Sequence, residues 1–91
     1  MEINFLTQIW REGKMYVSYA PELDVSSCGK TPEEAKRNLR EAVELFLEET
    51  DKMGTLKEIL EESGFVQEKK NQKILWQPPK IISTHKECMK V

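Results

Sequence analysis

Cysteine and histidine are scarce in this chain, whose 91 residues include two cysteines and one histidine. Cys28 and Cys88 do not make a disulfide framework, and in a reducing compartment they are free thiols. Together with His85 they supply three potential zinc ligands, whereas a structural zinc site almost always has four. We therefore expect no metal site within one chain. A site shared between two copies of the chain is the alternative that the sequence leaves. The simpler prediction is that Cys28 is buried and behaves as a small apolar residue, and that Cys88, near the terminus, is not held by packing.

Long apolar runs are also absent. The longest uninterrupted run is far shorter than the ~20 residues that a transmembrane helix needs. The first residues, MEINFLTQIWREG, do not place a basic region before an apolar block, as a signal peptide does. We therefore expect no membrane partner and a cytoplasmic location.

Candidate catalytic groups are few, and they do not converge. Ser83 and Thr84 directly precede the single histidine, but successive side chains of a strand point to opposite faces. No glycine-rich loop is present to cradle a phosphate. We therefore expect that the chain is not an enzyme and has no cofactor.

Four carboxylates lie between the second expected strand and the first expected helix. A nuclease-type metal site needs several carboxylates that converge on one point. Glu33 and Glu34 instead suit the first turn of a helix, where negative charge is favoured. Glu22 and Asp24 are ordinary turn residues. A hydrolase that uses Glu22 and Asp24 is the weakest interpretation of this stretch.

Charge is unevenly distributed along the chain. Residues 1–68, the acidic body, hold 8 Lys or Arg and 15 Asp or Glu, a balance of −7. Residues 69–91, the basic tail, hold 6 Lys and 1 Glu, a balance of +5. The acidic body disfavours broad phosphate binding and suits a basic protein partner, because opposite potentials steer encounter. Lysines this widely spaced in the basic tail are more often a solvated strand and its flanks than a nucleic-acid site.

The spacing of apolar residues predicts an α+β fold of order β-β-β-α-(α)-β in a single domain, 1–91. A three-stranded antiparallel sheet and a C-terminal strand are expected to pack against one long and one short helix. Residues 1–52 form the βββα core, and residues 53–91 add the short helix, the last strand and the basic tail. Strands are expected at about 2–10, Met15–Ala20, Asp24–Cys28 and Lys80–Lys86, helices at about 32–51 and 56–63, and a polar break at 69–72.

Helix ends are marked by local signals. Thr31 is expected to cap the long helix, with Pro32 at its first position and Glu34 completing a capping box. Residues 55–58 read as a second capping box. Gly64 followed by Phe65 fits a C-terminal cap with an apolar contact behind it.

Two short motifs at a defined separation carry a resemblance to a known family. Tyr16–Leu23 reads YVSYAPEL, and Cys28–Ala35 reads CGKTPEEA and leads into a helix rich in Glu, Ala, Val and Leu. Over roughly residues 3–50, the chain resembles the antitoxins of the HicB family. Ala20 stands where that family often has Cys, and the loop after Leu23 is shorter than usual.

The resemblance implies a partial ribonuclease-H-like fold without the catalytic carboxylates of the true nucleases, and a homodimer. It also implies the antitoxin-like role of a type II toxin–antitoxin system, in which the chain binds and neutralises a HicA-type toxin, a small basic protein that cleaves messenger RNA. Tyr19, Glu22 and Asp24 are the expected partner-binding residues. Nothing after Gly64 is long or helical enough for a helix-turn-helix, which argues against operator binding.

The alternative is a small dimeric nucleic-acid-binding protein. In that interpretation, the final strand carrying Lys80 and Lys86 pairs across a dimer and presents a basic ribbon, as the charge of the basic tail suggests. The same strand can instead pair within its own subunit or add to a neighbour's sheet, because an exposed strand edge accepts either.

Overall fold

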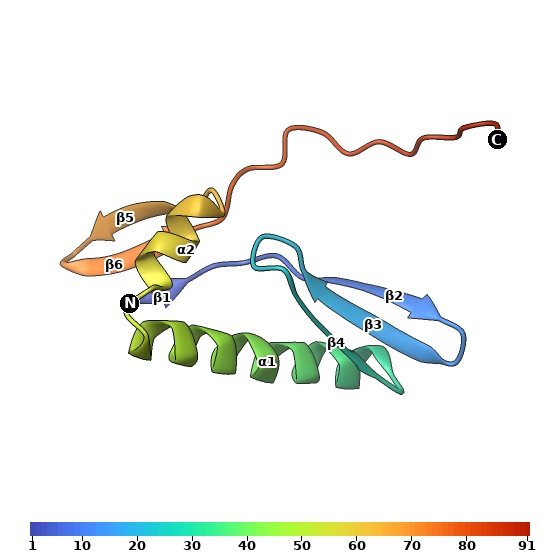
Figure 1. Ribbon diagram of the computed structural model, residues 1–91, viewed down its shortest axis with the longest axis horizontal. Coiled ribbons are helices and arrows are strands. Elements are labelled where there is room, and N and C mark those ends of the chain that lie inside the picture. The colour runs from blue at the N-terminus through green and yellow to red at the C-terminus, as the bar shows by residue number, and fades with distance from the viewer.

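The computed structural model describes residues 1–91 and has the predicted α+β class (Figure 1). Its elements follow the order β1 (Glu2–Ile3), β2 (Gln8–Glu12), β3 (Met15–Ala20), β4 (Val25–Gly29), α1 (Pro32–Lys52), α2 (Leu56–Glu62), β5 (Val66–Lys70) and β6 (Lys73–Gln77). Neither helix combines the length and the apolar character that crossing a membrane requires.

The strands form two three-stranded sheets. One has the order β2-β3-β4 and is antiparallel throughout. The other has the order β1-β6-β5, with β1 parallel to β6 and β5 antiparallel to it. Figure 1 shows α1 running along one side of the β2-β3-β4 sheet and ending beside β1, the first strand of the other sheet.

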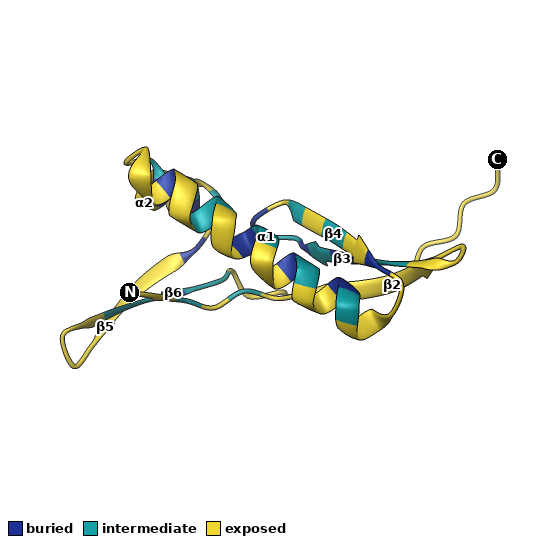
Figure 2. Ribbon diagram, turned by 90° about the horizontal axis from the view of Figure 1, so that it is seen from below, coloured by how far each residue is buried: buried dark blue, intermediate teal, exposed yellow.

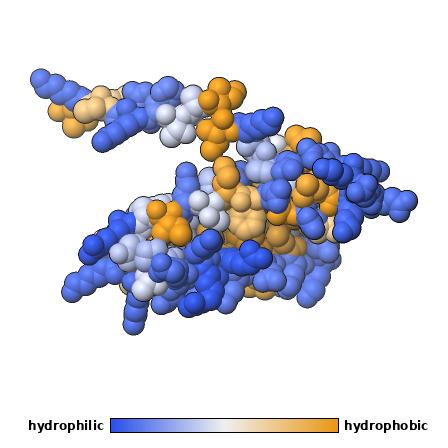
Figure 3. Space-filling model, turned by 180° about the vertical axis from the view of Figure 1, so that it is seen from behind, coloured by the Kyte–Doolittle hydropathy of each residue, from blue (hydrophilic) through white to orange (hydrophobic).

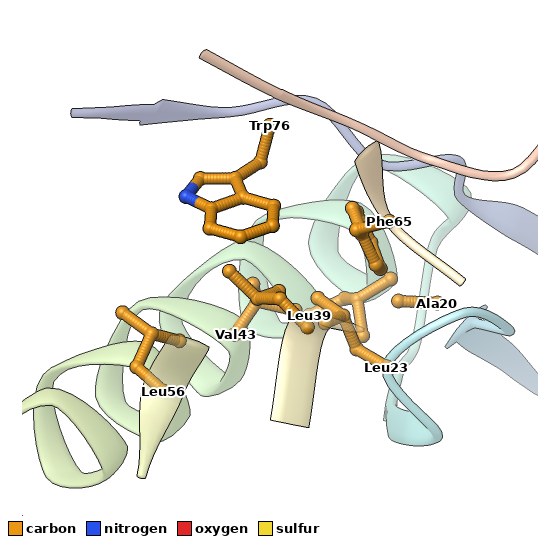
Figure 4. Packing of buried hydrophobic residues seen from close by; sticks show 8 residues of the cluster. Ala20, Leu23, Leu39, Val43, Leu56, Phe65 and Trp76 are labelled. Atoms are coloured by element: carbon orange, nitrogen blue, oxygen red, sulfur yellow. The ribbon is translucent and has the colours of Figure 1, made fainter. Parts of the chain in front are cut away.

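The core lies where α1 meets elements from both sheets (Figure 4). Trp76 of β6 and Phe65 pack with residues of both helices and of the loop after β3; the buried cluster is Ala20, Leu23, Leu39, Val43, Leu56, Leu60, Phe65 and Trp76. The indole N–H of Trp76 is buried without an acceptor, and in Figure 4 its nitrogen lies on the side of the ring away from Phe65. This small cluster therefore joins the two sheets through apolar contact alone.

Small residues bring the first turns of α1 very close to the β2-β3-β4 sheet. A Cβ atom placed on Gly29 would lie 2.5 Å from the backbone nitrogen of Ala35 and 2.9 Å from the carbonyl carbon of Glu34. Ser18 is completely buried, and its hydroxyl donates to the carbonyl oxygen of Ala35 at 2.7 Å. The stripe of buried residues along α1 in Figure 2 faces this contact and the core beyond it.

The N-terminal cap of α1 and the C-terminal cap of α2 follow the predicted local signals. The Thr31 hydroxyl accepts the N–H of Glu34 at 3.0 Å, and Pro32 is the first helical residue. At the end of α2, Gly64 has a φ of +87°, and Phe65 donates its N–H to the carbonyl of Leu60 at 2.9 Å. This is the left-handed cap with an apolar residue behind it that the sequence predicts.

The capping box predicted at residues 55–58 is wrong, because the side chain of Thr55 does not cap α2. The Thr55 hydroxyl makes no bond to the amides of α2. It is directed instead at the carbonyl of Thr50, at 3.4 Å, where α1 ends. Since the two helices are separated by only three residues, the same hydroxyl is within reach of the end of one helix and the start of the other.

The single strand predicted over residues 2–10 is divided into β1 and β2. Asn4 donates its N–H to the carbonyl of Trp76 in β6, whereas the N–H of Leu6 goes to Glu22, in the loop after β3. Residues two apart in a regular strand direct their N–H groups to the same side. The chain therefore leaves regular strand geometry near Phe5, where it passes from one sheet to the other.

The region after α2 differs most from the prediction. Residues 66–77 form the β5–β6 hairpin, closed by Asn71 and Gln72, which have φ values of +51° and +66°. The expected polar break at 69–72 is thus the end of β5 and its turn. All five residues of β5 are exposed, so no apolar alternation marks the strand in the sequence. The strand predicted over Lys80–Lys86 is wrong for the single chain, because residues 78–91, the C-terminal segment, have no regular structure.

The close contact between β4 and α1 makes Gly29 a sensitive position. Replacing Gly29 with Ala inserts a methyl group against the backbone of α1, and we expect the free energy of unfolding to fall by about 1–3 kcal/mol. Cys28→Ala, one residue earlier and exposed, is the matched control and should change it by less than about 0.5 kcal/mol. Urea unfolding of the three proteins measures the difference, and equal stabilities would contradict the assigned contact.

Candidate functional site

The surface of the β2-β3-β4 sheet opposite α1 is open. Ser18 and Ala20 are buried on the side of the helix, so the alternate residues of β3 lie on the other side. The strand register adds their neighbours from β2 and β4. We call this surface the open face; it comprises Gln8, Trp10, Glu12, Met15, Val17, Tyr19, Ser26 and Cys28.

Apolar and aromatic side chains occupy the middle of the open face. Trp10 is 41% exposed and Met15 is 38% exposed. The Trp10 and Tyr19 rings meet edge to face, with centroids 6.3 Å apart and planes at 78°. The indole N–H of Trp10 donates to Glu12 at 2.9 Å. This face therefore offers a rigid aromatic pair with a carboxylate beside it.

Tyr19 and Asp24 are joined by a hydrogen bond at one end of this face. The phenol of Tyr19 donates to Oδ1 of Asp24 at 2.8 Å. Asp24 has a φ of +54°, a left-handed conformation that Asp tolerates in turns. The hydrogen bond to Asp24, followed by partial desolvation and the nearby negative charge, raises the pKa of Tyr19 above its ordinary value of 10.0.

Glu22 contacts the segment in which the chain passes from one sheet to the other. Its Oε1 accepts the backbone N–H of Leu6 at 2.8 Å, in the segment between β1 and β2. That N–H has left the regular ladder, so the carboxylate replaces the carbonyl that a neighbouring strand would supply. Glu22 is thus a structural residue as well as a negative charge near the open face.

The predicted partner-binding residues are brought together, and all three side chains already have hydrogen-bond partners within the fold. Tyr19 lies on the open face, while Glu22 and Asp24 lie in the loop that follows β3. Trp10 and Met15 belong to the same surface and were missed as site residues. The two-residue turn between β2 and β3 sets the register that places Trp10 opposite Val17, and that signal could have identified them.

The remaining candidate residues lie elsewhere. Cys28 is exposed on the open face, so the prediction that it is buried is wrong. No three His, Cys, Asp or Glu side chains lie close enough together to hold a metal ion, and Cys28, His85 and Cys88 are not gathered. Lys80 lines a hollow with Leu6, and Lys86 lies further along the exposed C-terminal segment.

A cationic stripe interrupts the acidic body on the helix. A hollow of about 280 Å³ lies between α1 and the segment that joins β1 to β2. Its lining residues are Phe5, Thr7, Glu33, Lys36, Arg37 and Arg40. The three cations belong to α1, which covers the opposite side of the sheet from the open face. The α1 side of the sheet therefore carries this group of cations, whereas the open face carries apolar and aromatic side chains with Glu12 beside them.

Comparisons with protein-family models, with curated proteins and with solved structures found no match. The resemblance of residues 3–50 to the HicB antitoxins stays a prediction from the two sequence motifs.

The bond between Tyr19 and Asp24 can be read from the titration of the phenol. The raised pKa means that the bond stabilises the fold fully below pH 10.0, and that this contribution is lost as the pH rises through the raised pKa. In a Tyr16→Phe background, phenolate absorbance reports Tyr19 alone. We expect Asp24→Asn to lower the pKa of Tyr19 toward 10.0, and an unchanged titration would show that the carboxylate does not act on the phenol.

The bond between Glu22 and Leu6 predicts a graded response to substitution. Glu22→Ala leaves the N–H of Leu6 without its acceptor and should lower the free energy of unfolding by about 1 kcal/mol. Glu22→Gln keeps an acceptor oxygen and should cost less than half as much. Thermal or urea unfolding distinguishes the two, and an equal loss in both variants would mean that charge, not the hydrogen bond, matters.

Proposed function

We propose that this chain is an antitoxin-like protein-binding module, which binds and neutralises a small basic messenger-RNA-cleaving toxin of the HicA type. The open face is the surface that would meet the toxin. We place this activity in the cytoplasm, where messenger RNA is translated and cleaved. The class of partner comes from the sequence resemblance, and the observation that carries the choice of surface is the exposed Trp10, paired with the half-buried Tyr19 among carboxylates.

The composition of the open face supports a protein partner. Trp, Tyr and Met are enriched in protein–protein interfaces, where buried aromatic residues supply much of the binding free energy. On a monomer, exposed apolar surface that gathers in one place usually marks an interaction site. Trp10, Met15, Val17 and Tyr19 form such a group on one side of one sheet.

Charge supports a basic partner. Glu12, Glu22 and Asp24 lie on or beside the open face, within an acidic body whose balance is −7. A negative surface raises the rate of encounter with a basic protein, and the effect weakens as salt screens it. The cations of α1 lie on the opposite side of the sheet, so they do not cancel this field locally.

The other interpretations have less support. Asp24 is hydrogen-bonded to Tyr19 and Glu22 to Leu6, so the hydrolase interpretation would require both carboxylates to give up their present partners. The nucleic-acid interpretation has only Lys80 and Lys86 as cations within residues 80–86, and no Phe, Tyr or Trp lies beside them to stack on bases.

A binding and inhibition assay with the toxin encoded next to this protein tests the proposal. We expect Trp10→Ala to weaken binding by about 30-fold, equivalent to about 2 kcal/mol, and to reduce inhibition of RNA cleavage in parallel. Leu45→Ala is the matched control, because Leu45 is an exposed apolar residue on α1, away from the open face. A toxin that is neither bound nor inhibited would refute the function, and equal effects of both variants would refute the surface.

A further inference from the structure

The β2-β3-β4 sheet ends in an open strand edge. β2 is the outer strand of that sheet, with β3 on its inner side. Glu12 and Met15 flank the two-residue turn and form the closing hydrogen-bonded pair of the hairpin. Hydrogen bonding alternates along an antiparallel pair, so Trp10 and Gln8 also face β3, whereas Ile9 and Arg11 direct their backbone groups away from it. These two residues make the edge of β2 ready to accept another strand.

The C-terminal segment has the composition of a strand but no partner. Ile81 and Ile82 are 60% and 98% exposed, and β-branched residues recur through the stretch IISTH at 81–85. In Figure 3 the side chains of this segment lie clear of the body. The radius of gyration is 15.4 Å, against about 12 Å for a compact chain of this length. Apolar side chains in water and an unpaired backbone both favour association with an edge.

The fold brings this segment to the side on which β2 is open. β1 belongs to the same N-terminal stretch as β2, and its partner β6 lies along the edge that β3 does not occupy. The C-terminal segment continues β6 beyond Gln77, and a hollow lined by Leu6, Pro78 and Ile81 marks its departure. Figure 1 shows the segment and β2 running in the same direction from that point.

Pro78 and Pro79 interrupt the backbone hydrogen bonding between β6 and the C-terminal segment. They occupy the positions where the ladder of β6 would continue, and neither has an N–H to donate. No hydrogen bond joins residues 78–91 to β2. The segment instead extends away from the rest of the chain, where it can meet the β2 edge of another copy.

A second copy is the occupant that the chain itself supplies, because the unpaired C-terminal segment and the open edge of β2 belong to the same sequence. The contact is self-complementary, because each chain carries one such segment and one open edge. Reciprocal exchange then closes a twofold dimer and leaves neither edge exposed.

We propose that residues 80–86 of one copy add as a strand to the open edge of β2 in a second copy, and that the exchange is reciprocal. The edge of β2 supplies the backbone groups of Ile9 and Arg11, and Ile81 and Ile82 bring the apolar contact. The proposal is independent of the toxin: it assigns how two copies join, and it leaves the middle of the open face accessible.

Sedimentation velocity over a range of concentrations, together with amide hydrogen exchange, tests this exchange in the full chain. We expect a dimer in which the Ile9 and Arg11 amides are protected, and protection that is lost on dilution to monomer. The double variant Ile82→Pro/Ser83→Pro removes an N–H at two adjacent positions, one of which must face the edge. It should raise the dissociation constant at least tenfold and expose both amides.

Met89→Pro/Lys90→Pro is the matched control, since it makes the same change in the same exposed segment outside residues 80–86. It should leave the dimer intact. A chain that is monomeric at every concentration would overturn the proposal, as would a dimer that both double variants leave unchanged. Protection of Ile9 and Arg11 that persists in the monomer would show that the segment closes on its own β2, which also overturns the exchange.

Discussion

The contact on which this structure depends is the close approach of α1 to β3 and β4. Gly29 leaves no room for a side chain, Ala35 is fully buried, and Ser18 donates its hydroxyl to the helix. Such an approach requires three small residues on three elements, and it aligns the helix along the sheet from its first turn. Once the helix is aligned, Leu39 and Val43 lie where the core of both sheets forms.

A helix held on one side of a sheet leaves the other side to solvent. The small core can cover only one face, because a chain of 91 residues has limited apolar surface to bury. The exposure of Trp10 and the partial exposure of Tyr19 therefore follow from the architecture and not from a local anomaly. Glu22 has a comparable structural role. Where the chain passes between the sheets, its carboxylate accepts a backbone N–H that no neighbouring strand reaches.

Local signals in the sequence were sufficient for the helices, and long-range contacts decided what was missed. Thr31 and Gly64 act on residues within one helical turn, so their roles could be predicted. The division of the first strand depends on Trp76 and Glu22, which lie far along the chain. Tyr19 was predicted as a partner-binding residue from the stretch that carries the motif, but assigning Trp10 to the same face requires the strand register and the side that α1 covers.

Residues 80–86 show why a strand cannot be read from composition alone. A helix satisfies most of its backbone groups within its own sequence, whereas every ladder hydrogen bond of a strand is made with another strand. The segment has the β-branched residues of a strand, but in the single chain no backbone hydrogen bond joins it to β2. The proposed exchange gives this strand-like sequence a partner outside its own chain, because the open edge of β2 is present in every copy.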